Sequence, residues 1–452
     1  MTPKFAVVGH PNKGKSTIVA ALAMDDSVAI SQVPGTTTKA KEYPLTIDGK
    51  LVYTLIDTPG FQRPRAVLAY LKSKNAPAHK RLDVLKSFIK EHENNPKFND
   101  DIELLKPIAD GAGIIYIVDA SKPYSVEFEL DMQILSYAGA PSMAILNFIT
   151  DSDYSKEWKE ALKHYFKLIK RFNPMQADIK EYIDLLEAFG HLNEEWQDSI
   201  KEAVEAFKKL HKDRINKSAL VITNLVFNSL SHTKKMAIKD DSSEVRKKLE
   251  KAFYNDIVMF EKSSFSKIKD IWDHKRVEVK QDEFSFDSVE LFSKESEEYF
   301  GLSEKELITY GATLGAAVGG GIDLAFLGHT LFAGAAIGGI VGAIGGYLSF
   351  GKLADIKILG HKLGGKELII GPIKNINFGF ILLNRALIFT KVIATLSHAK
   401  RDDISISEHK DILSDKDKKD FYKLHKKIID KKTDDLKEQY SKKVAQIIES
   451  MV

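Results

Sequence analysis

The sequence predicts an α/β domain with a mostly parallel sheet flanked by helices, followed by a mainly α-helical region that contains a glycine-rich helical hairpin. Continuous apolar runs such as Gly113–Val118 and Met143–Leu146 are typical of strands buried in a parallel sheet. From Ile179 onward, apolar residues recur at three- and four-residue steps, which indicates amphipathic helices. The glycine spacing within 308–350 then indicates two helices that approach each other closely.

Length and composition limit the class of protein. The chain has 452 residues, which is too many for one ordinary core, so we expect two or three domains. Cysteine is absent, which excludes disulfides, thiolate metal sites and a cysteine nucleophile. The net charge of +3, from 66 basic and 63 acidic residues, argues against a nucleic-acid binder driven by bulk charge. Because the first apolar run begins at Phe5, we expect no signal peptide and a cytoplasmic location.

The stretch Gly9–Thr17 organises the first part of the chain. It follows the apolar run Phe5–Val8 and precedes the helical pattern Ile18–Leu22, so it reads as a loop between a strand and a helix. The spacing G-x-x-x-x-G-K-[ST] is that of a phosphate-binding loop, whose glycines let backbone N–H groups face the phosphates at a helix N-terminus. Lys15 would then bridge the β- and γ-phosphates, and the Ser16 hydroxyl would ligate Mg²⁺. We assign to nucleotide binding the residues Asn12, Lys13, Gly14, Lys15, Ser16 and Thr17.

A turn with three hydroxyls, Pro34–Thr38, follows the first predicted helix. A loop at this position can place a threonine oxygen on Mg²⁺ when a γ-phosphate is present. We assign this role to Thr37, with Thr36 or Thr38 as alternatives because the three threonines are consecutive.

A predicted hairpin then leads into a second phosphate-proximal motif. Its strands flank the turn signal Asp48-Gly49, and the second strand, Leu51–Ile56, runs into Asp57-Thr58-Pro59-Gly60. Asp57, at the end of a buried strand, can hold the Mg²⁺ shell. The N–H of Gly60 can contact the γ-phosphate.

The motifs Gly9–Ser16, Pro34–Thr38 and Asp57–Gly60 together resemble those of the translation-factor-like small GTPases, and within them the Era/TrmE-like branch. The resemblance implies an α/β P-loop GTPase domain that binds GTP and GDP with Mg²⁺ and hydrolyses GTP. It also implies a K⁺ ion at Asn12. Phe61 stands where Ras-like enzymes carry a water-orienting glutamine, so hydrolysis must use another group, a cation or a partner. The predicted catalytic residues are Lys15, Thr37 and Gly60.

The segment 62–107 is long for the region after such a motif. It contains Arg63, Arg65 and Arg81 and one expected helix, Arg81–His92. We interpret it as an extended switch whose arginines approach phosphates or a partner, or as a solvated insertion.

The base-reading element departs from the N-K-x-D pattern of GTPases. The chain reads Asn147-Phe148-Ile149-Thr150-Asp151, so the asparagine fits, phenylalanine replaces lysine, and the aspartate comes one place late. Phe148 can stack on the base where a lysine stem would lie. We expect guanine, with adenine or loose specificity as alternatives. A last strand, Tyr165–Phe172, leads to the loop predicted for the final base contacts.

The second informative stretch is Ile308–Phe350. It contains one acidic residue, Asp323, and no basic residue except His329, and glycines recur every four residues. Each arm, Ile308–Leu327 and Thr330–Phe350, is about 20 residues, which as a helix spans about 30 Å, the thickness of a bilayer core. We predict a hairpin that inserts into the inner membrane, or a buried hairpin in a soluble domain. Asp323 is costly in lipid unless it lies near the interface.

Over nearly its full length, the chain resembles bacterial GTPases that carry a C-terminal domain of unknown function, number 3482. The runs FAVVGHPNKGKS, DTPGFQRPRA and GPIKNINF (371–378) carry this resemblance. The predicted segments are 1–178, with 62–107 as the insertion, then 179–300, 301–358 and 359–452. After the hairpin we expect a strand over Lys366–Ile373 and an apolar helix over Phe378–Lys400.

We therefore expect a GTP-binding and GTP-hydrolysing switch at the cytoplasmic face of a membrane. The expected partners are a guanine nucleotide, lipid contacted through 308–350, and a second copy in a nucleotide-dependent homodimer, whereas nucleic acid is not expected. One alternative is a soluble Era-like assembly GTPase acting on RNA or the ribosome. Another is a membrane structural protein that binds nucleotide with little hydrolysis.

Overall fold

The computed structural model describes most of the chain and divides it into two compact units. The described residues are 2–10, 13–23, 39–47, 49–175, 177–238, 243–274, 291, 294–315, 349–352, 357–358, 361–362, 366–395, 412–430 and 434–452. Unit 1 comprises residues 1–212 and 395–401, and unit 2 comprises 213–394 and 402–452. Asn12, the threonines at 36–38, Asp323 and most of the predicted glycine-rich hairpin lie outside the described residues.

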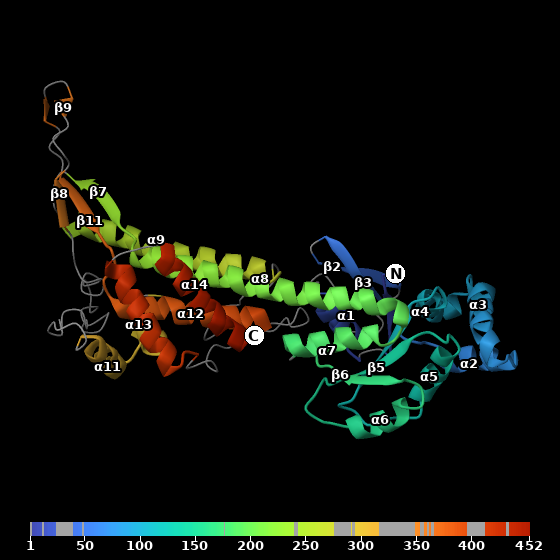
Figure 1. Cartoon of the computed structure of the whole chain (residues 1–452). Coiled ribbons are helices and arrows are strands. Elements are labelled where there is room, and N and C mark those ends of the chain that lie inside the picture. Colours follow the sequence, from blue (N-terminus) through green and yellow to red (C-terminus); the bar gives the residue numbers. More distant parts are fainter. Residues whose placement is uncertain are drawn as a thin grey trace. The chain divides into compact units, whose positions relative to one another are not determined.

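A six-stranded sheet forms the centre of unit 1 (Figure 1). The strand order is β2-β3-β1-β4-β5-β6, and every neighbouring pair is parallel except β2 with β3. This confirms the predicted mostly parallel sheet. The strands are β1 Lys4–Val8, β2 Lys41–Ile47, β3 Lys50–Asp57, β4 Gly113–Asp119, β5 Ser142–Asn147 and β6 Leu168–Arg171.

Helices cover both faces of this sheet, and strand β1 shows why. Its side chains alternate between two buried clusters, because successive residues of a strand point to opposite faces. Phe5 and Val7 belong to one cluster with α1 (Lys15–Ala23), α7 (Ile179–Gly190) and the start of α8 (Gln197–Leu230). Ala6 and Val8 belong to the other, with α5 (Phe128–Ser136) and α6 (Ser155–Leu162).

Two differences from the predicted boundaries have packing reasons. The strand predicted over Tyr165–Phe172 is only β6, because the backbone N–H groups of Tyr165 and Phe166 donate to the Leu162 carbonyl and close a turn after α6. Residues 179–212 also belong to unit 1 rather than to a separate helical part. Trp196 packs edge-on against Phe5 of β1, which places this amphipathic pattern on the sheet.

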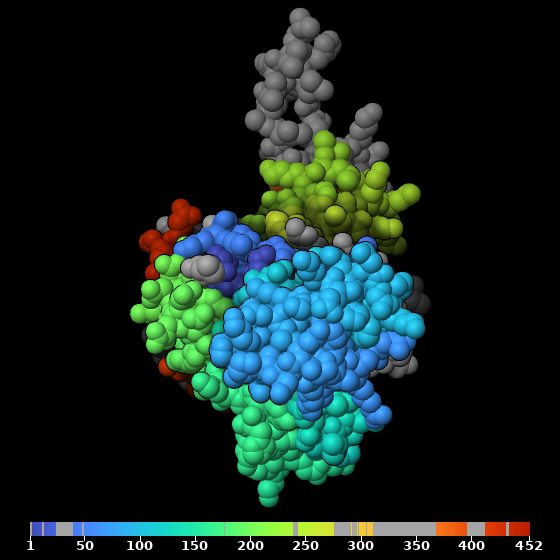
Figure 2. Space-filling view, turned by 90° about the vertical axis from the view of Figure 1, so that its right-hand side faces the viewer, coloured from blue at the N-terminus to red at the C-terminus, as the bar shows by residue number. Residues whose placement is uncertain are grey.

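The 62–107 insertion contains three α-helices, where the sequence indicated one. They are α2 (Pro64–Ser73), α3 (Arg81–His92) and α4 (Asn99–Ala109), so the one predicted helix is confirmed as α3. Two short 3-10 turns, Ala78–Lys80 and Pro96–Phe98, connect them. Figure 2 shows the light-blue atoms of this part of the chain as a broad lobe on one face. Leu71, Leu85, Phe88 and Leu104 join the lobe to the sheet's cluster.

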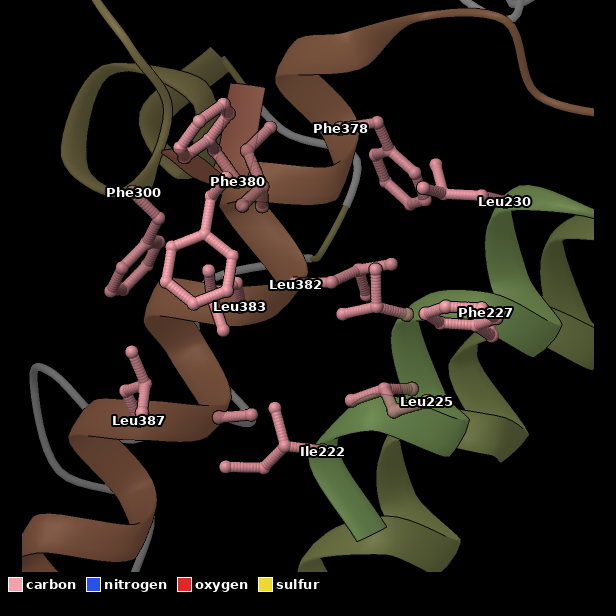
Figure 3. Close-up of a cluster of buried hydrophobic side chains, with 14 of the residues drawn as sticks. Ile222, Leu225, Phe227, Leu230, Phe300, Phe378, Phe380, Leu382, Leu383 and Leu387 are labelled. Carbon is pink, nitrogen blue, oxygen red and sulfur yellow. The ribbon is translucent and has the colours of Figure 1, made fainter. Parts of the chain in front are cut away.

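Unit 2 is mainly helical, as the sequence predicts. Its core lies between α8, α9 (Ser243–Ile271) and α12 (Ile376–Thr395), with the two terminal helices packed on it. Figure 3 shows Phe227 of α8 facing Leu382 of α12, and Leu230 of α8 facing Phe378 of α12. The remaining helices are α10 Lys294–Phe300, α11 Glu304–Gly315, α13 Asp415–Asp430 and α14 Asp434–Met451.

Short strands accompany these helices. An antiparallel sheet has the order β7-β11-β8, formed by Lys234–Ile238, Lys366–Ile370 and Ser349–Lys352. The pair β9 (Lys357–Ile358) and β10 (His361–Lys362) forms a separate two-stranded sheet. Strand β11 is shorter than the predicted Lys366–Ile373.

Helix α12 is long and apolar enough to cross a membrane, the one such helix among the described residues. However, 78% of its most apolar window is buried inside the protein. Phe380, Leu383 and Leu387 are fully buried in the unit 2 core. A core helix passes the same test of length and composition, so the hydropathy of α12 is explained by packing.

Candidate nucleotide-binding site

The loop between β1 and α1 has the backbone geometry that its glycines permit. Gly9 and Gly14 adopt φ values of +154° and +85°. A Cβ added at Gly9 would lie 2.4 Å from the Ile117 carbonyl oxygen, and one at Gly14 would lie 2.3 Å from Asn147 Nδ2. Both positions therefore require glycine for conformation and for space.

Lys15 is folded back over this loop. Its Nζ donates to the Gly9 carbonyl at 2.9 Å and to the His10 carbonyl at 3.1 Å. The residue is only 9% exposed, and burial lowers the pKa of the ammonium to about 8, while Asp57 and Asp131 act in the opposite direction. A buried cation held by two neutral carbonyls is suited to an anionic ligand, because a phosphate would supply the charge that these carbonyls lack.

Two oxygen groups meet at the start of α1 and the end of β3. The Ser16 hydroxyl donates to Asp57 Oδ2 at 2.9 Å, and Asp57 is 3% exposed. The next residue, Thr58, is fixed because its hydroxyl donates to the Val7 carbonyl at 2.7 Å. A hydroxyl and a carboxylate are oxygen ligands of the kind that Mg²⁺ prefers, so this pair fits the metal that a phosphate-binding loop uses. The predicted third ligand, Thr37, is outside the described residues.

Gly60 and Phe61 follow directly. Gly60 is buried, and Phe61 is 6% exposed within the cluster that contains Val67 and Leu68 of α2. The Phe61 side chain therefore serves as a core residue that anchors the insertion. Its ring has no group that could orient water.

The base-reading edge shows a different arrangement from the GTPase pattern. Asn147, at the end of β5, donates from Nδ2 to the Lys13 carbonyl at 3.0 Å. Its side chain therefore stabilises the backbone of the phosphate loop. The Arg171 guanidinium lies 4.3 Å from the centre of the Phe148 ring, and Arg171 Nη1 donates to Asp153 Oδ2 at 2.9 Å. One face of the Phe148 ring thus carries Arg171, and the stacking of Phe148 on a base stays a prediction. Asp151 is exposed.

Lys13 is held at the carboxyl edge of the sheet. Its Nζ lies 3.8 Å from Asp119 Oδ2 at the end of β4. The pKa of Lys13 is lowered because burial outweighs the attraction of Asp119. The site therefore combines two partly dehydrated lysines, Lys13 and Lys15, on one loop.

Sequence reasoning missed a buried polar group beneath the loop. His10 Nε2 lies 3.1 Å from Asp131 Oδ2, and the Asp131 side chain is fully buried on α5. Burial raises the pKa of Asp131, although His10 and Lys15 oppose the shift. The available signal was an aspartate within the apolar run of α5, which a carboxylate occupies only when it has a polar partner.

Helix α4 supplies two further carboxylates that the sequence did not single out. Asp101 Oδ1 accepts from the backbone N–H groups of Gln62 at 3.1 Å and Arg63 at 3.2 Å. Glu103 Oε2 accepts from the Ala40 N–H at 2.9 Å. These contacts join the insertion to the chain on both sides of the Asp57 motif.

The fold and this site define a P-loop GTPase domain. In agreement, residues 4–148 match the model described as "50S ribosome-binding GTPase". Residues 159–452 match the model of domain of unknown function DUF3482, which covers more than half of the chain. The chain therefore belongs to the DUF3482 family.

Curated relatives are similar only to part of this chain. GTPase Der from Thermoanaerobacter sp. (strain X514) is 30% identical over 169 residues, which are 37% of this chain and 32% of that protein. GTPase Der from Staphylococcus haemolyticus (strain JCSC1435) is 24% identical over 234 residues, 50% of this chain and 44% of that protein. The chain thus spans less than half of the length of these curated relatives.

Among solved structures, a variant of Era from Aquifex aeolicus bound to GDP and AlF4⁻ aligns at 14% identity. The alignment covers 53% of this chain and 72% of that chain, with a TM-score of 0.28.

Proposed function

We propose that this protein binds GTP and hydrolyses it to GDP, acting as a nucleotide-dependent switch of the Era/TrmE-like type. The observation that carries the proposal is the Ser16–Asp57 hydrogen bond of 2.9 Å beside the buried Lys15. This bond joins Ser16 to Asp57, which lies 41 positions later in the chain. The Lys15 cation and two oxygen groups of the kind that ligate Mg²⁺ therefore lie together.

Each residue has a distinct role in the proposed reaction. Lys15 and the loop N–H groups stabilise the negative charge that develops on the β- and γ-phosphates. Ser16, Asp57 and Thr37, or its neighbour Thr36 or Thr38, hold Mg²⁺, which would neutralise charge on the phosphate oxygens when bound. The Gly60 N–H senses the γ-phosphate.

The chain must orient the attacking water without a glutamine. Phe61 is buried and apolar, so we propose that a K⁺ ion held by Asn12, or a group from a partner, takes this role. Turnover by the isolated protein is then slow. Activity at least tenfold higher in KCl than in NaCl, lost on Asn12→Ala, is the expected result, and equal activity in the two salts would exclude the K⁺ site.

We propose guanine as the base. Asn147 occupies the asparagine position of the base-reading motif, and Asp153 lies nearby, paired with Arg171. The test is a titration with GDP and ADP, in KCl and in NaCl. Tight GDP binding with weak ADP binding supports the proposal. Equal affinity for the two would mean that the altered motif no longer selects a base.

The variant Lys15→Ala tests whether nucleotide binding and hydrolysis depend on the phosphate loop. We expect GDP affinity to fall by at least tenfold and hydrolysis to be lost, because the loop would lose the cation that its carbonyls hold at the Gly9 and His10 positions, and Lys13 is turned toward Asp119. A Lys15→Ala chain that binds and hydrolyses GTP like the parent would overturn the proposed function.

We further propose that the protein acts at the cytoplasmic face of the inner membrane through residues 308–350. The support is their composition, with one acidic and no basic residue besides His329, and arms of bilayer length. Flotation of the full chain with vesicles of anionic and neutral lipid, with GDP or a GTP analogue, tests this. A nucleotide-dependent homodimer would appear in the same samples as a change in mass.

The soluble alternative keeps the same nucleotide site. The family model for residues 4–148 is described as a ribosome-binding GTPase, which favours an assembly role on RNA or the ribosome. The full chain remaining unbound to vesicles but sedimenting with ribosomal particles in GTP would favour it. A chain that floats with vesicles but shows no turnover, even with K⁺, would instead be a structural membrane protein.

A further inference from the structure

The 62–107 insertion reaches the nucleotide site through one helix, α4. Leu104, Leu105 and Ile108 of α4 are buried in the same cluster as Val8 of β1 and Ile56 of β3. The helix is therefore packed against the strands that carry the phosphate loop and Asp57. Its position is set by the core rather than by the surface of the lobe.

The first turn of α4 holds the chain after the Asp57 motif. Asp101 is fully buried, and its Oδ1 accepts from two consecutive backbone N–H groups, those of Gln62 and Arg63. A carboxylate at this place is favoured because it lies in the first turn of a helix, near the positive end of the dipole. These bonds fix the backbone two residues beyond Gly60.

The next turn of α4 holds the segment that precedes β2, on the other side of the Asp57 motif. Glu103 accepts from the N–H of Ala40, the residue directly before β2. Lys41, the first residue of β2, is the register partner of Asp57 on β3. The contact therefore lies one residue from the strand position opposite Asp57.

We propose that Asp101 and Glu103 are positioning residues that clamp the backbone on both sides of Asp57–Gly60, so that the insertion tunes how the site responds to the γ-phosphate. The inference rests on the proposed function, because it assigns to a packed helix the control of the groups that would meet Mg²⁺ and the γ-phosphate.

The test measures discrimination between nucleotides in the full chain. GDP and the non-hydrolysable analogue GMPPNP are titrated with Mg²⁺ into the parent, Glu103→Ala, Glu103→Gln and Asp100→Ala. Asp100 is the control for charge: it is an acidic residue of α4 three positions before Glu103, and no described contact joins it to residues 40 or 62–63.

We expect Glu103→Ala to weaken GMPPNP binding about tenfold while GDP binding changes by less than twofold, since one hydrogen bond to a charged acceptor is lost beside Asp57. Glu103→Gln restores the parent ratio, because an amide oxygen still accepts from Ala40. Asp100→Ala keeps the parent ratio. A residue with only a structural role would lower the thermal midpoint and weaken both nucleotides alike.

The failures are distinguishable. A parent chain that binds neither nucleotide overturns the proposed function, and this inference with it. A parent that binds both, with Glu103→Ala weakening the two equally or leaving both unchanged, overturns the clamp alone. If Glu103→Gln behaves like Glu103→Ala, charge rather than the hydrogen bond to Ala40 is responsible, and the clamp is also overturned.

Discussion

At the scale of the residue, Lys15 links burial to ligand chemistry. Burial lowers the pKa of its ammonium to about 8, so Lys15 in the folded protein binds its proton less tightly than a lysine in water does. A bound phosphate favours the charged form and raises that pKa again. Nucleotide binding and protonation of Lys15 are therefore coupled.

This coupling predicts a pH dependence of GDP affinity. Below pH 8 the lysine is charged in the free and the bound protein, so affinity is at its maximum. Above pH 8 the free protein loses the proton that the complex retains, so affinity falls by up to about tenfold per pH unit until the pKa of the complex is passed. Calorimetric titrations with GDP from pH 7 to 9.5 measure it. Lys15→Ala must bind weakly with no such slope; a slope retained in that variant would assign the effect to another group.

Gly14 predicts a second effect at the same scale. Gly14→Ala places a Cβ 2.3 Å from Asn147 Nδ2 at a φ of +85°, so we expect GDP affinity to fall at least about 100-fold. Adding Asn147→Ala relieves the close contact but not the backbone strain, and restores affinity only in part.

Gly139→Ala is the matched control for strain. Its φ is +58°, and nothing lies within 4 Å of the added Cβ. We expect a loss of about 1 kcal/mol in unfolding free energy with GDP affinity unchanged. Equal loss of GDP affinity in Gly139→Ala and Gly14→Ala would show that general destabilisation, not the loop, is responsible.

Residues with a fixed spacing could be predicted from the sequence. The phosphate loop and Asp57 belong to local motifs, and the structure brings Ser16 and Asp57 together. His10, Asp131, Asp101 and Glu103 could not be predicted, because their contacts join distant parts of the chain. Helical periodicity alone does not say which carboxylate turns inward.

At the scale of the element, a buried ion pair joins α9 to α12. Arg385 Nε donates to Glu261 Oε1 at 2.7 Å and Nη2 donates to Oε2 at 3.1 Å, and both side chains are at most 6% exposed. Such a bidentate pair fixes the register of two helices within an apolar core. It also explains how α12 carries an arginine among its buried apolar residues.

Removing one partner should therefore cost more than removing both. Arg385→Met leaves the Glu261 carboxylate buried without its cation and should lower the unfolding free energy of unit 2 by about 3–5 kcal/mol. The double variant with Glu261→Met should be closer to the parent, because no charge remains buried. Urea unfolding followed by Trp272 fluorescence reports on unit 2. Additive losses in the double variant would contradict this account.

Element types were predicted better than element ends. The apolar runs of β4 and β5 identified strands, since a parallel strand buried on both faces reads as a short continuous apolar run. The insertion is different: α2 and α4 were not identified because their apolar faces pack on a sheet that is distant in sequence. Similarly, the hydropathy of α12 alone does not distinguish a core helix from a membrane span.

At the scale of the whole molecule, the chain builds separate cores. The cluster of unit 2 begins at Ile215, whereas the apolar residues of α8 that pack on the sheet end at Leu210. One helix thus contributes to two cores through different residues. The predicted boundary at residue 178 came from the point where the sequence changes to amphipathic helical periodicity. This periodicity does not reveal which core an amphipathic helix covers.

Separate cores predict two unfolding transitions. A ligand that binds only unit 1 raises only its transition, by about 2.7 kcal/mol at a GDP concentration of 100 times the dissociation constant. Trp158 and Trp196 report on unit 1 and Trp272 on unit 2, so Trp272→Phe isolates the first signal. With Lys15→Ala the shift should disappear. If GDP moves both transitions equally in the parent, the two cores unfold as one.

The two edge strands of the six-stranded sheet have a consequence for self-association. Edge strand β2 carries Pro44, which has no N–H, and a bulge between Leu45 and Thr46, and edge strand β6 is only four residues long. Interrupted or short edges resist strand addition by another chain, which protects the protein from aggregation during synthesis. A homodimer formed through unit 1 would then use helical or loop surfaces rather than an extension of this six-stranded sheet.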